Sequence, residues 1–452
     1  MKKLFKTLSA LLVTAVAMTA LTMPVAADTQ YAAITGNKVT FYKTLIVDKD
    51  AKIPNLDFTF STAGDGAVTG DPTDQNNPTI TVLNGTGTID PVTVRFNPTT
   101  AFDADNAHGV RADYKTATLP VEIDLTAATY SEPGVYRYYI TEANGDSRVL
   151  YDVNAGLTEA TGEGARVRTL DVYVEDTGAS TPALAVTGYV MYQGKVTAAP
   201  SVGTNATNGD AVSGNVVIGE SGIYVVTGGN TVTEATSAGT KTNYIMNAYK
   251  THDLTFGKEV IGNQGSRDKY FKVRVTCTGL NDTDEFPVDM SHAEKTPTKT
   301  TATSYTAAEM AAKNNIAGDK LTGAQLKAGY DFYLQDGNYV TILGLPEGCG
   351  YEVSETAEDY TSNQKISATN SSLDWDGSAG ADALNDELSG TMTADKHTGF
   401  TNEKKGVIPT GVLLVATPVI IVALIAVAGV VFFAVRSAKN RAQEDEAETA
   451  EE

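Results

Sequence analysis

The chain has 452 residues, enough for two or three domains, and carries a formal net charge of -21 with 20% charged residues. This acidity excludes nucleic acid as a partner, because nucleic-acid binding needs a basic surface. The two cysteines are too few for a disulfide scaffold, and the four scattered histidines show no metal-ligand spacing, so we expect no metal, no cofactor and no enzymatic turnover.

The first predicted element is an export signal at residues 1–27. It begins with lysines, continues with an apolar run and ends with small residues, a pattern typical of a secretory signal peptide cleaved after Ala27. We therefore expect the mature chain to leave the cytoplasm.

Residues 28–406 are predicted to be β-structure. Short alternating runs bounded by Gly, Asn, Asp and Pro favour a β-sandwich chain, which we divide into domains at 28–250 and 251–406. Residues from about 181 to 240 are rich in small polar types, and we interpret them as an elaboration of the first domain. One short helix is expected where Thr306 and Glu309 form a capping-box pattern.

Each predicted domain begins with a strand that has a lysine on its apolar face, VTFYKTLIV at 39–47 and LTFGKEV at 254–260. Successive strand residues point to opposite faces, so each lysine shares a face with apolar neighbours. In both halves a strand with an inward glutamate and a closing strand with an asparagine follow, at similar spacing. The two triplets are Lys43, Glu142 and Asn247, then Lys258, Glu355 and Asn402.

These triplets indicate a chemistry that a buried lysine permits. Burial lowers a lysine pKa and raises a glutamate pKa, so the two groups can coexist as a neutral amine and a neutral acid. The amine can then attack the asparagine side chain, with the glutamate passing protons, to expel ammonia and form an amide. Such a bond would close a long loop, for a gain on the order of 4 kcal/mol if the disulfide treatment applies.

Simpler interpretations of the same residues stay open. Each lysine could lie on an edge strand or extend its ammonium group to water. Asn402 could belong to a turn. The recurrence of two triplets in the same order favours the chemical interpretation.

The two cysteines lie in the second half, Cys277 in phase with apolar strand positions and Cys349 just before the glutamate strand. An exported protein permits a bridge between them, and equally Cys277 could be a small buried apolar residue.

The C-terminal part is predicted to be an anchor. Residues 412–435 are uncharged and apolar, long enough to span a bilayer of about 30 Å, and residues 436–452 form a charged tail that begins with basic residues and stays inside the cell. Directly before this run lies the stretch Val407, Ile408, Pro409, Thr410 and Gly411.

Together these features resemble a known family. The lysine strand, the YRYYITE strand with the following YDVNAG, and the closing asparagine strand are similar to the streptococcal pilin isopeptide-linkage domain of T-antigen-type backbone pilins. The second half, with FYLQDGNYVTILGLPEGCGYEVSE, also resembles the B-type repeat domains of collagen-binding adhesins. The resemblance implies two tandem immunoglobulin-like β-sandwich domains, with bonds from Lys43 to Asn247 promoted by Glu142 and from Lys258 to Asn402 promoted by Glu355.

The stretch at 407–411 is similar to the sorting signal of that pilin type, although position 407 is Val rather than Glu or Gln. The resemblance implies that a sortase cuts between Thr410 and Gly411 and passes the Thr410 carbonyl to an amine. Lys241 is the expected acceptor in a neighbouring copy, with Lys195 as the second choice, although any single lysine is more often an ordinary solvated residue.

The implied protein is a structural pilin subunit, exported, held as a membrane-anchored precursor and then attached to the wall or pilus of a Gram-positive cell. Its expected partners are a sortase, copies of itself or other pilins, cell-wall peptidoglycan and a host surface ligand. The alternative is a wall-anchored adhesin that uses the same stalk domains without polymerising.

Overall fold

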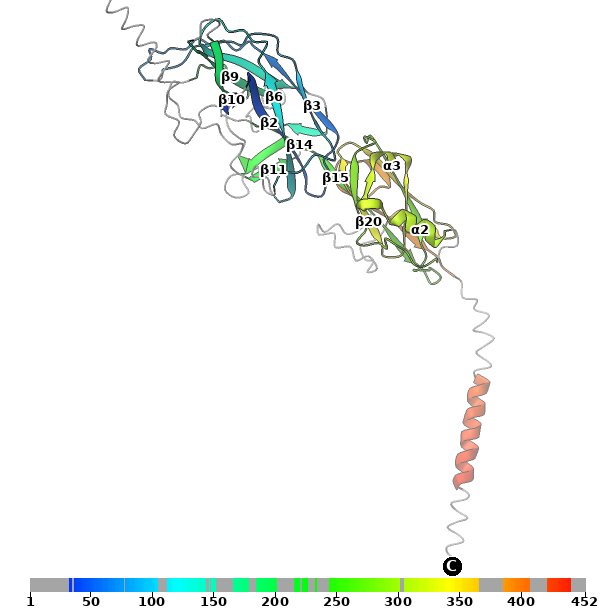
Figure 1. Ribbon diagram of the computed structural model, residues 1–452. Coiled ribbons are helices and arrows are strands. Elements are labelled where there is room, and N and C mark those ends of the chain that lie inside the picture. The colour runs from blue at the N-terminus through cyan, green and yellow to red at the C-terminus, as the bar shows by residue number, and fades with distance from the viewer. Residues whose placement is uncertain are drawn as a thin grey trace, which may run out of the picture.

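The computed structural model describes residues 32–34, 36–76, 78–104, 112–143, 146, 148–151, 166–178, 184–200, 215–219, 222–226, 232–233, 244–300, 305–365, 384, 386–406 and 421–439. Two successive bodies of β-strands and a separate C-terminal helix make up this part of the chain (Figure 1). The prediction of an all-β fold is confirmed. The predicted signal peptide at 1–27 and the stretch at 407–411 lie outside the described residues.

The first body, which we call the first sandwich, consists of two sheets. One sheet has the strand order β1-β10-β9-β7-β3-β5, with β4 paired beside β7, and the other has the order β6-β2-β14-β8. The strands are β1 (Ala32–Ala33), β2 (Lys38–Asp48), β3 (Leu56–Ala63), β4 (Val82–Asn84), β5 (Val92–Phe96), β6 (Tyr114–Asp124), β7 (Gly134–Glu142), β8 (Val149–Tyr151), β9 (Val167–Asp176), β10 (Leu184–Gln193) and β14 (Tyr244–Tyr249).

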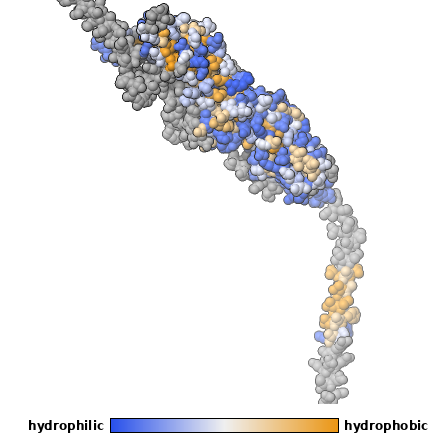
Figure 2. Space-filling view, viewed as in Figure 1, coloured by the Kyte–Doolittle hydropathy of each residue, from blue (hydrophilic) through white to orange (hydrophobic). Residues whose placement is uncertain are grey.

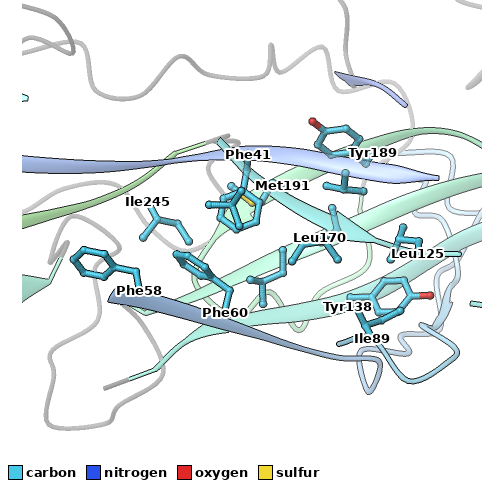
Figure 3. Close-up of a cluster of buried hydrophobic side chains, with 14 of the residues drawn as sticks. Phe41, Phe58, Phe60, Ile89, Leu125, Tyr138, Leu170, Tyr189, Met191 and Ile245 are labelled. Carbon is cyan, nitrogen blue, oxygen red and sulfur yellow. The ribbon is translucent and has the colours of Figure 1, made fainter. Parts of the chain in front are cut away.

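A single apolar core lies between these two sheets. Phe41 from β2 and Ile245 from β14 meet Phe60 from β3 and Leu170 from β9, all fully buried (Figure 3). The alternation of apolar and polar residues along β2 and β3 places one face of each strand in this core, as period-2 patterning predicts.

The range expected to be an elaboration, 181–240, is only partly one. β10 lies inside this range, yet it is a full strand of the larger sheet and pairs with β9 and β1. A separate three-stranded sheet follows, built from β11 (Asn215–Gly219), β12 (Gly222–Val226) and β13 (Val232–Thr233). The long alternating run LAVTGYVMYQ belongs to β10, so its strand pattern was a better guide than the composition of the range.

The second sandwich also has two sheets around one core. Their strand orders are β18-β17-β20-β15-β24-β22 and β19-β16-β21-β23. The strands are β15 (Thr251–Ile261), β16 (Phe271–Thr278), β17 (Glu285–Asp289), β18 (Lys320–Thr322), β19 (Tyr330–Leu334), β20 (Tyr339–Pro346), β21 (Gly350–Glu355), β22 (Thr361–Asn363), β23 (Ser389–Thr391) and β24 (Lys396–Glu403).

Short helices interrupt this sandwich between β17 and β19. They are α2 (Ala307–Asn314), the 3-10 helix η4 (Ala317–Asp319) and α3 (Gly323–Ala328). The capping box predicted for α2 is present, because the Thr306 side chain accepts from the Glu309 backbone and the Glu309 side chain accepts in return. The prediction of this helix is confirmed.

The first and last long strands of each sandwich are paired in parallel. β2 lies beside β14, with Lys43 next to Ile245, and β15 lies beside β24, with Lys258 next to Phe400. Parallel neighbours that are distant in sequence bring the lysine strand and the asparagine strand of each half together.

Lys250 alone connects β14 to β15, so the two sandwiches follow each other with almost no linker. Hydrogen bonds form part of the contact between them. The Asn55 backbone nitrogen donates to Asp284 Oδ1 over 2.8 Å, and its side chain donates to the same atom over 2.6 Å. Asp284 is 2% exposed, so this junction is buried and specific.

The helix at Ile421–Lys439 is long and apolar enough to cross a membrane, judged by length and composition. Its apolar side chains are exposed, whereas the visible face of the sandwiches is mostly hydrophilic (Figure 2). The apolar helix therefore fits the predicted membrane anchor, although it extends to Lys439, beyond the predicted end at residue 435, and residues 412–420 lie outside the described part.

Candidate functional site

The first candidate site joins three strands of the first sandwich. Lys43 Nζ from β2 lies 2.8 Å from Glu142 Oε1 at the end of β7. Asn247 Nδ2 from β14 donates to the same oxygen over 2.9 Å. All three side chains are fully buried, so the structure brings the first predicted triplet together inside the core.

The second candidate site repeats this arrangement. Lys258 Nζ from β15 lies 3.0 Å from Glu355 Oε1 on β21, and Asn402 Nδ2 from β24 donates to that oxygen over 3.2 Å. Lys258 also donates to the backbone carbonyls of Glu259 and Phe400. Lys258 and Asn402 are fully buried, so neither belongs to an exposed edge or turn.

An aromatic ring covers each lysine. Lys43 Nζ lies 4.3 Å from the centroid of Phe58 on β3, and Lys258 Nζ lies 4.6 Å from the centroid of Phe271 on β16. Both rings belong to the strand that follows the lysine strand, and they exclude water while making a cation-π contact. No sequence motif singles out these phenylalanines, although each occupies an inward position of a strand with alternating burial.

The burial of the second site changes its protonation. Burial lowers the pKa of Lys258 to about 8, even though the nearby Glu355 carboxylate acts in the opposite direction. Burial likewise raises the pKa of Glu355. Both shifts favour the neutral amine and the neutral acid, the pair in which the lysine is a nucleophile.

The asparagine oxygens are the unusual atoms of the two sites. Within the described part of the chain, Asn247 Oδ1 and Asn402 Oδ1 are buried and accept no hydrogen bond. A buried carbonyl without a partner is costly, and such atoms often mark a reactive group. In each site, an amine and an amide nitrogen thus both contact one carboxylate oxygen, and the amide oxygen accepts no hydrogen bond from the described residues.

A different network surrounds Glu355 Oε2. Ser362 from the short strand β22 donates its hydroxyl hydrogen to this oxygen over 3.2 Å. No sequence pattern singled out Ser362, because the three residues of β22 are all exposed and have no alternation.

The cysteines are both present as free, buried thiols. Cys277 lies on β16 opposite Tyr351, and Cys349 precedes β21 by one residue. The structure thus contains no Cys277–Cys349 bridge and fits the alternative in which Cys277 is a small core residue.

The predicted acceptor Lys241 and the sortase stretch, Thr410 and Gly411 included, lie outside the described residues. Lys195 is described. It is half-buried, with its Nζ 5.1 Å from the ring centroid of Tyr139. Among the residues that the structure describes, no cluster of His, Cys, Asp or Glu could hold a metal ion.

Comparison with known proteins finds a matching family model and a similar pilin. A family described as a domain of unknown function, DUF7601, matches residues 252–404. A protein named pilin from Streptococcus pyogenes serotype M1 is 25% identical over 411 residues, which cover 88% of this chain and 91% of that protein.

Similar solved structures include two streptococcal major pilins. The major pilin of Streptococcus pyogenes is 20% identical, with 82% of this chain and 100% of that chain covered, at a TM-score of 0.42. The T-13 major pilin of Streptococcus pyogenes is 18% identical with the same coverage, at a TM-score of 0.40. The chain is a homologue of a streptococcal pilin, and the predicted resemblance to pilins is confirmed.

Proposed function

We propose that this protein is a structural pilin subunit whose two sandwiches crosslink themselves by Lys–Asn isopeptide bonds. The observation that carries the proposal is the pair of buried Lys–Glu–Asn triplets, each with its lysine nitrogen and asparagine nitrogen on one glutamate oxygen. The bonds would join Lys43 to Asn247 and Lys258 to Asn402.

The chemistry of each bond balances without an added reagent. The glutamate takes a proton from the lysine ammonium, and the neutral amine attacks the asparagine Cγ. The bond between Cγ and the asparagine side-chain nitrogen then breaks. This nitrogen receives the proton held by the glutamate and one proton from the attacking amine, and it leaves as ammonium. The glutamate returns to its starting state, and the chain ends with a neutral amide where a buried charge would otherwise be costly.

The reaction occurs once per site, so the glutamates Glu142 and Glu355 promote a maturation step rather than a turnover. The protein is structural, in keeping with its pilin homologue. The domain division at 28–250 and 251–406 belongs to this proposal, with one crosslink in each domain.

Assembly would follow from the C-terminal part. After export by the signal peptide, a sortase would cut between Thr410 and Gly411 and join Thr410 to Lys241 of a neighbouring copy, or finally to cell-wall peptidoglycan. The apolar helix at Ile421–Lys439 fits the anchor that holds the precursor in the membrane until then. The protein would then lie at the surface of a Gram-positive cell, where other pilins and a host ligand are its further partners.

A non-polymerising wall-anchored adhesin is the second candidate. The same sandwiches would serve as a stalk, and no lysine would accept Thr410. The two candidates share the crosslinks and differ only in assembly.

Two measurements test the proposal. The intact mass of residues 28–406 should fall short of the calculated mass by two ammonia molecules, about 34 Da in total, and an unmodified mass would reject the crosslinks. Cell extracts should contain a ladder of SDS-resistant multimers that disappears in Lys241→Arg. A single monomer band from wild-type cells would favour the adhesin, and a ladder that persists in Lys241→Arg but disappears in Lys195→Arg would move the acceptor to Lys195.

A further inference from the structure

The carboxyl group of Glu355 is held at both of its oxygens. Oε1 contacts Lys258 Nζ at 3.0 Å and Asn402 Nδ2 at 3.2 Å. Oε2 faces the other way and accepts the hydrogen bond from Ser362 over 3.2 Å. One oxygen therefore serves the two reacting groups, and the other is bound to a residue that does not react.

The position of Ser362 follows from strand register. β22 pairs antiparallel with β24, and Ser362 lies directly opposite Asn402. Residues opposite each other in an antiparallel pair point to the same face of the sheet. Ser362 thus points toward the site that Asn402 enters, although its strand is at the exposed edge.

We infer that Ser362 is a positioning residue for Glu355, which keeps Oε2 as a hydrogen-bond acceptor so that the transferred proton stays on Oε1. The inference rests on the proposed crosslinking reaction. The proton must pass from the lysine side to the asparagine side, and both groups are at Oε1. A proton on Oε2 would point away from both of them and toward Ser362.

The contact also affects protonation. Burial raises the pKa of Glu355, and the hydrogen bond from Ser362 is one of the contacts that limit the rise. Removing the hydroxyl therefore makes Glu355 easier to protonate. The pair then takes up a second proton, and becomes unreactive, at a higher pH than in the wild-type chain.

The first sandwich provides an internal reference. Within the described residues, Glu142 Oε2 is buried and has no hydrogen-bond partner, while Glu142 Oε1 has the same two contacts as Glu355 Oε1. Loss of Ser362 should therefore affect one crosslink of the chain and leave the other unchanged.

The experiment follows both crosslinks in one chain during synthesis. The full chain is made in a cell-free extract and quenched at intervals over a range of pH. The crosslinked peptides of each domain are then quantified by mass spectrometry after digestion. The variants are Ser362→Ala, which lacks the hydroxyl, and Ser362→Thr, which retains it. Ser362 is exposed at a sheet edge, so both variants are expected to fold.

We expect Ser362→Ala to form the Lys258–Asn402 bond several-fold more slowly than wild type. In a plot of this rate against pH, the acid limb should move to higher pH. Ser362→Thr should restore both the wild-type rate and the wild-type pH dependence. The Lys43–Asn247 bond should form at the wild-type rate in every variant. Equal rates and profiles in wild type and Ser362→Ala would overturn the inference, as would a slower rate that Ser362→Thr does not restore. If neither bond forms in the wild-type chain, the proposed function itself fails.

Discussion

Glu355→Gln should prevent the second crosslink and leave the first intact. Glutamine keeps the shape of the side chain and has no carboxyl group to accept or return a proton, so Lys258 cannot pass its proton to the site. The variant should lose one ammonia, about 17 Da, from its calculated mass, where the wild-type chain loses two.

The stability change can be worked out from the loop that the bond would close. About 145 residues separate Lys258 from Asn402, and the chain-entropy relation for a crosslink gives about 5 kcal/mol for such a loop. For a domain of roughly 150 residues, 1 kcal/mol corresponds to about 2–4 °C in Tm, so the second sandwich should melt about 10–20 °C earlier. Loss of the carboxylate beside Lys258 acts in the same direction.

The assay combines intact mass with calorimetry of residues 28–406. Glu352→Gln is the matched control, because Glu352 lies on the same strand but is exposed, and its replacement should change neither the mass deficit nor either transition by more than about 0.5 kcal/mol. If Glu355→Gln still loses two ammonia molecules, the role assigned to Glu355 is wrong. A lost crosslink with an unchanged Tm would refute the loop-closure argument alone.

Three further predictions concern groups outside the crosslinks. Burial raises the pKa of Asp253 to about 6, so the folded chain binds its proton more tightly than the unfolded chain, and stability should fall as the pH rises from about 4 to about 6. Asp253→Asn should remove that loss of stability. In urea titrations, its free energy of unfolding should exceed the wild-type value by up to about 3 kcal/mol at pH 8 and equal it at pH 4. Asp171→Asn should destabilise the first sandwich by about 3–5 kcal/mol in urea titrations, because it leaves the buried guanidinium of Arg137 without its carboxylate at 2.6 Å. The exposed pair of Asp57 is the control, and Asp57→Asn should cost less than about 1 kcal/mol. Finally, Cys277 and Cys349 are both free and buried. A thiol reagent should therefore react with no cysteine of the folded chain and with two after unfolding, and a reductant should leave Tm unchanged.

The strand patterns predicted the lysine of each triplet, because a lysine among apolar neighbours can be recognised in a short local run of residues. Lys43 and Lys258 break an alternation that is otherwise apolar on one face. The parallel pairing that brings Asn247 and Asn402 to them follows from a long-range register that no local pattern encodes.

Other features depend on what covers a strand. In β7 the pattern correctly gives an inward face that includes Tyr138 and Glu142, but Arg137 and Tyr139 on the opposite face are buried as well. They are covered because backbone carbonyls of a later segment accept from both side chains, Val196 being the shared acceptor. Burial by a segment that is distant in sequence cannot be derived from period-2 alternation. The position of Ser362 beside Glu355, on an exposed edge strand, cannot be derived from it either.

The single residue between the two sandwiches has a mechanical consequence. With both bonds formed, tension applied to the ends of the exported part would pass from Asn402 across to Lys258, back along β15 through Lys250 to Asn247, and across to Lys43. The long stretches between each pair of bonded residues would carry none of it. Between Lys43 and Asn402, the part of the backbone that carries the load would be the short path through Lys250, which is already extended as β-strand on both sides. A subunit with both bonds, pulled at its two ends, would therefore lengthen little between Lys43 and Asn402.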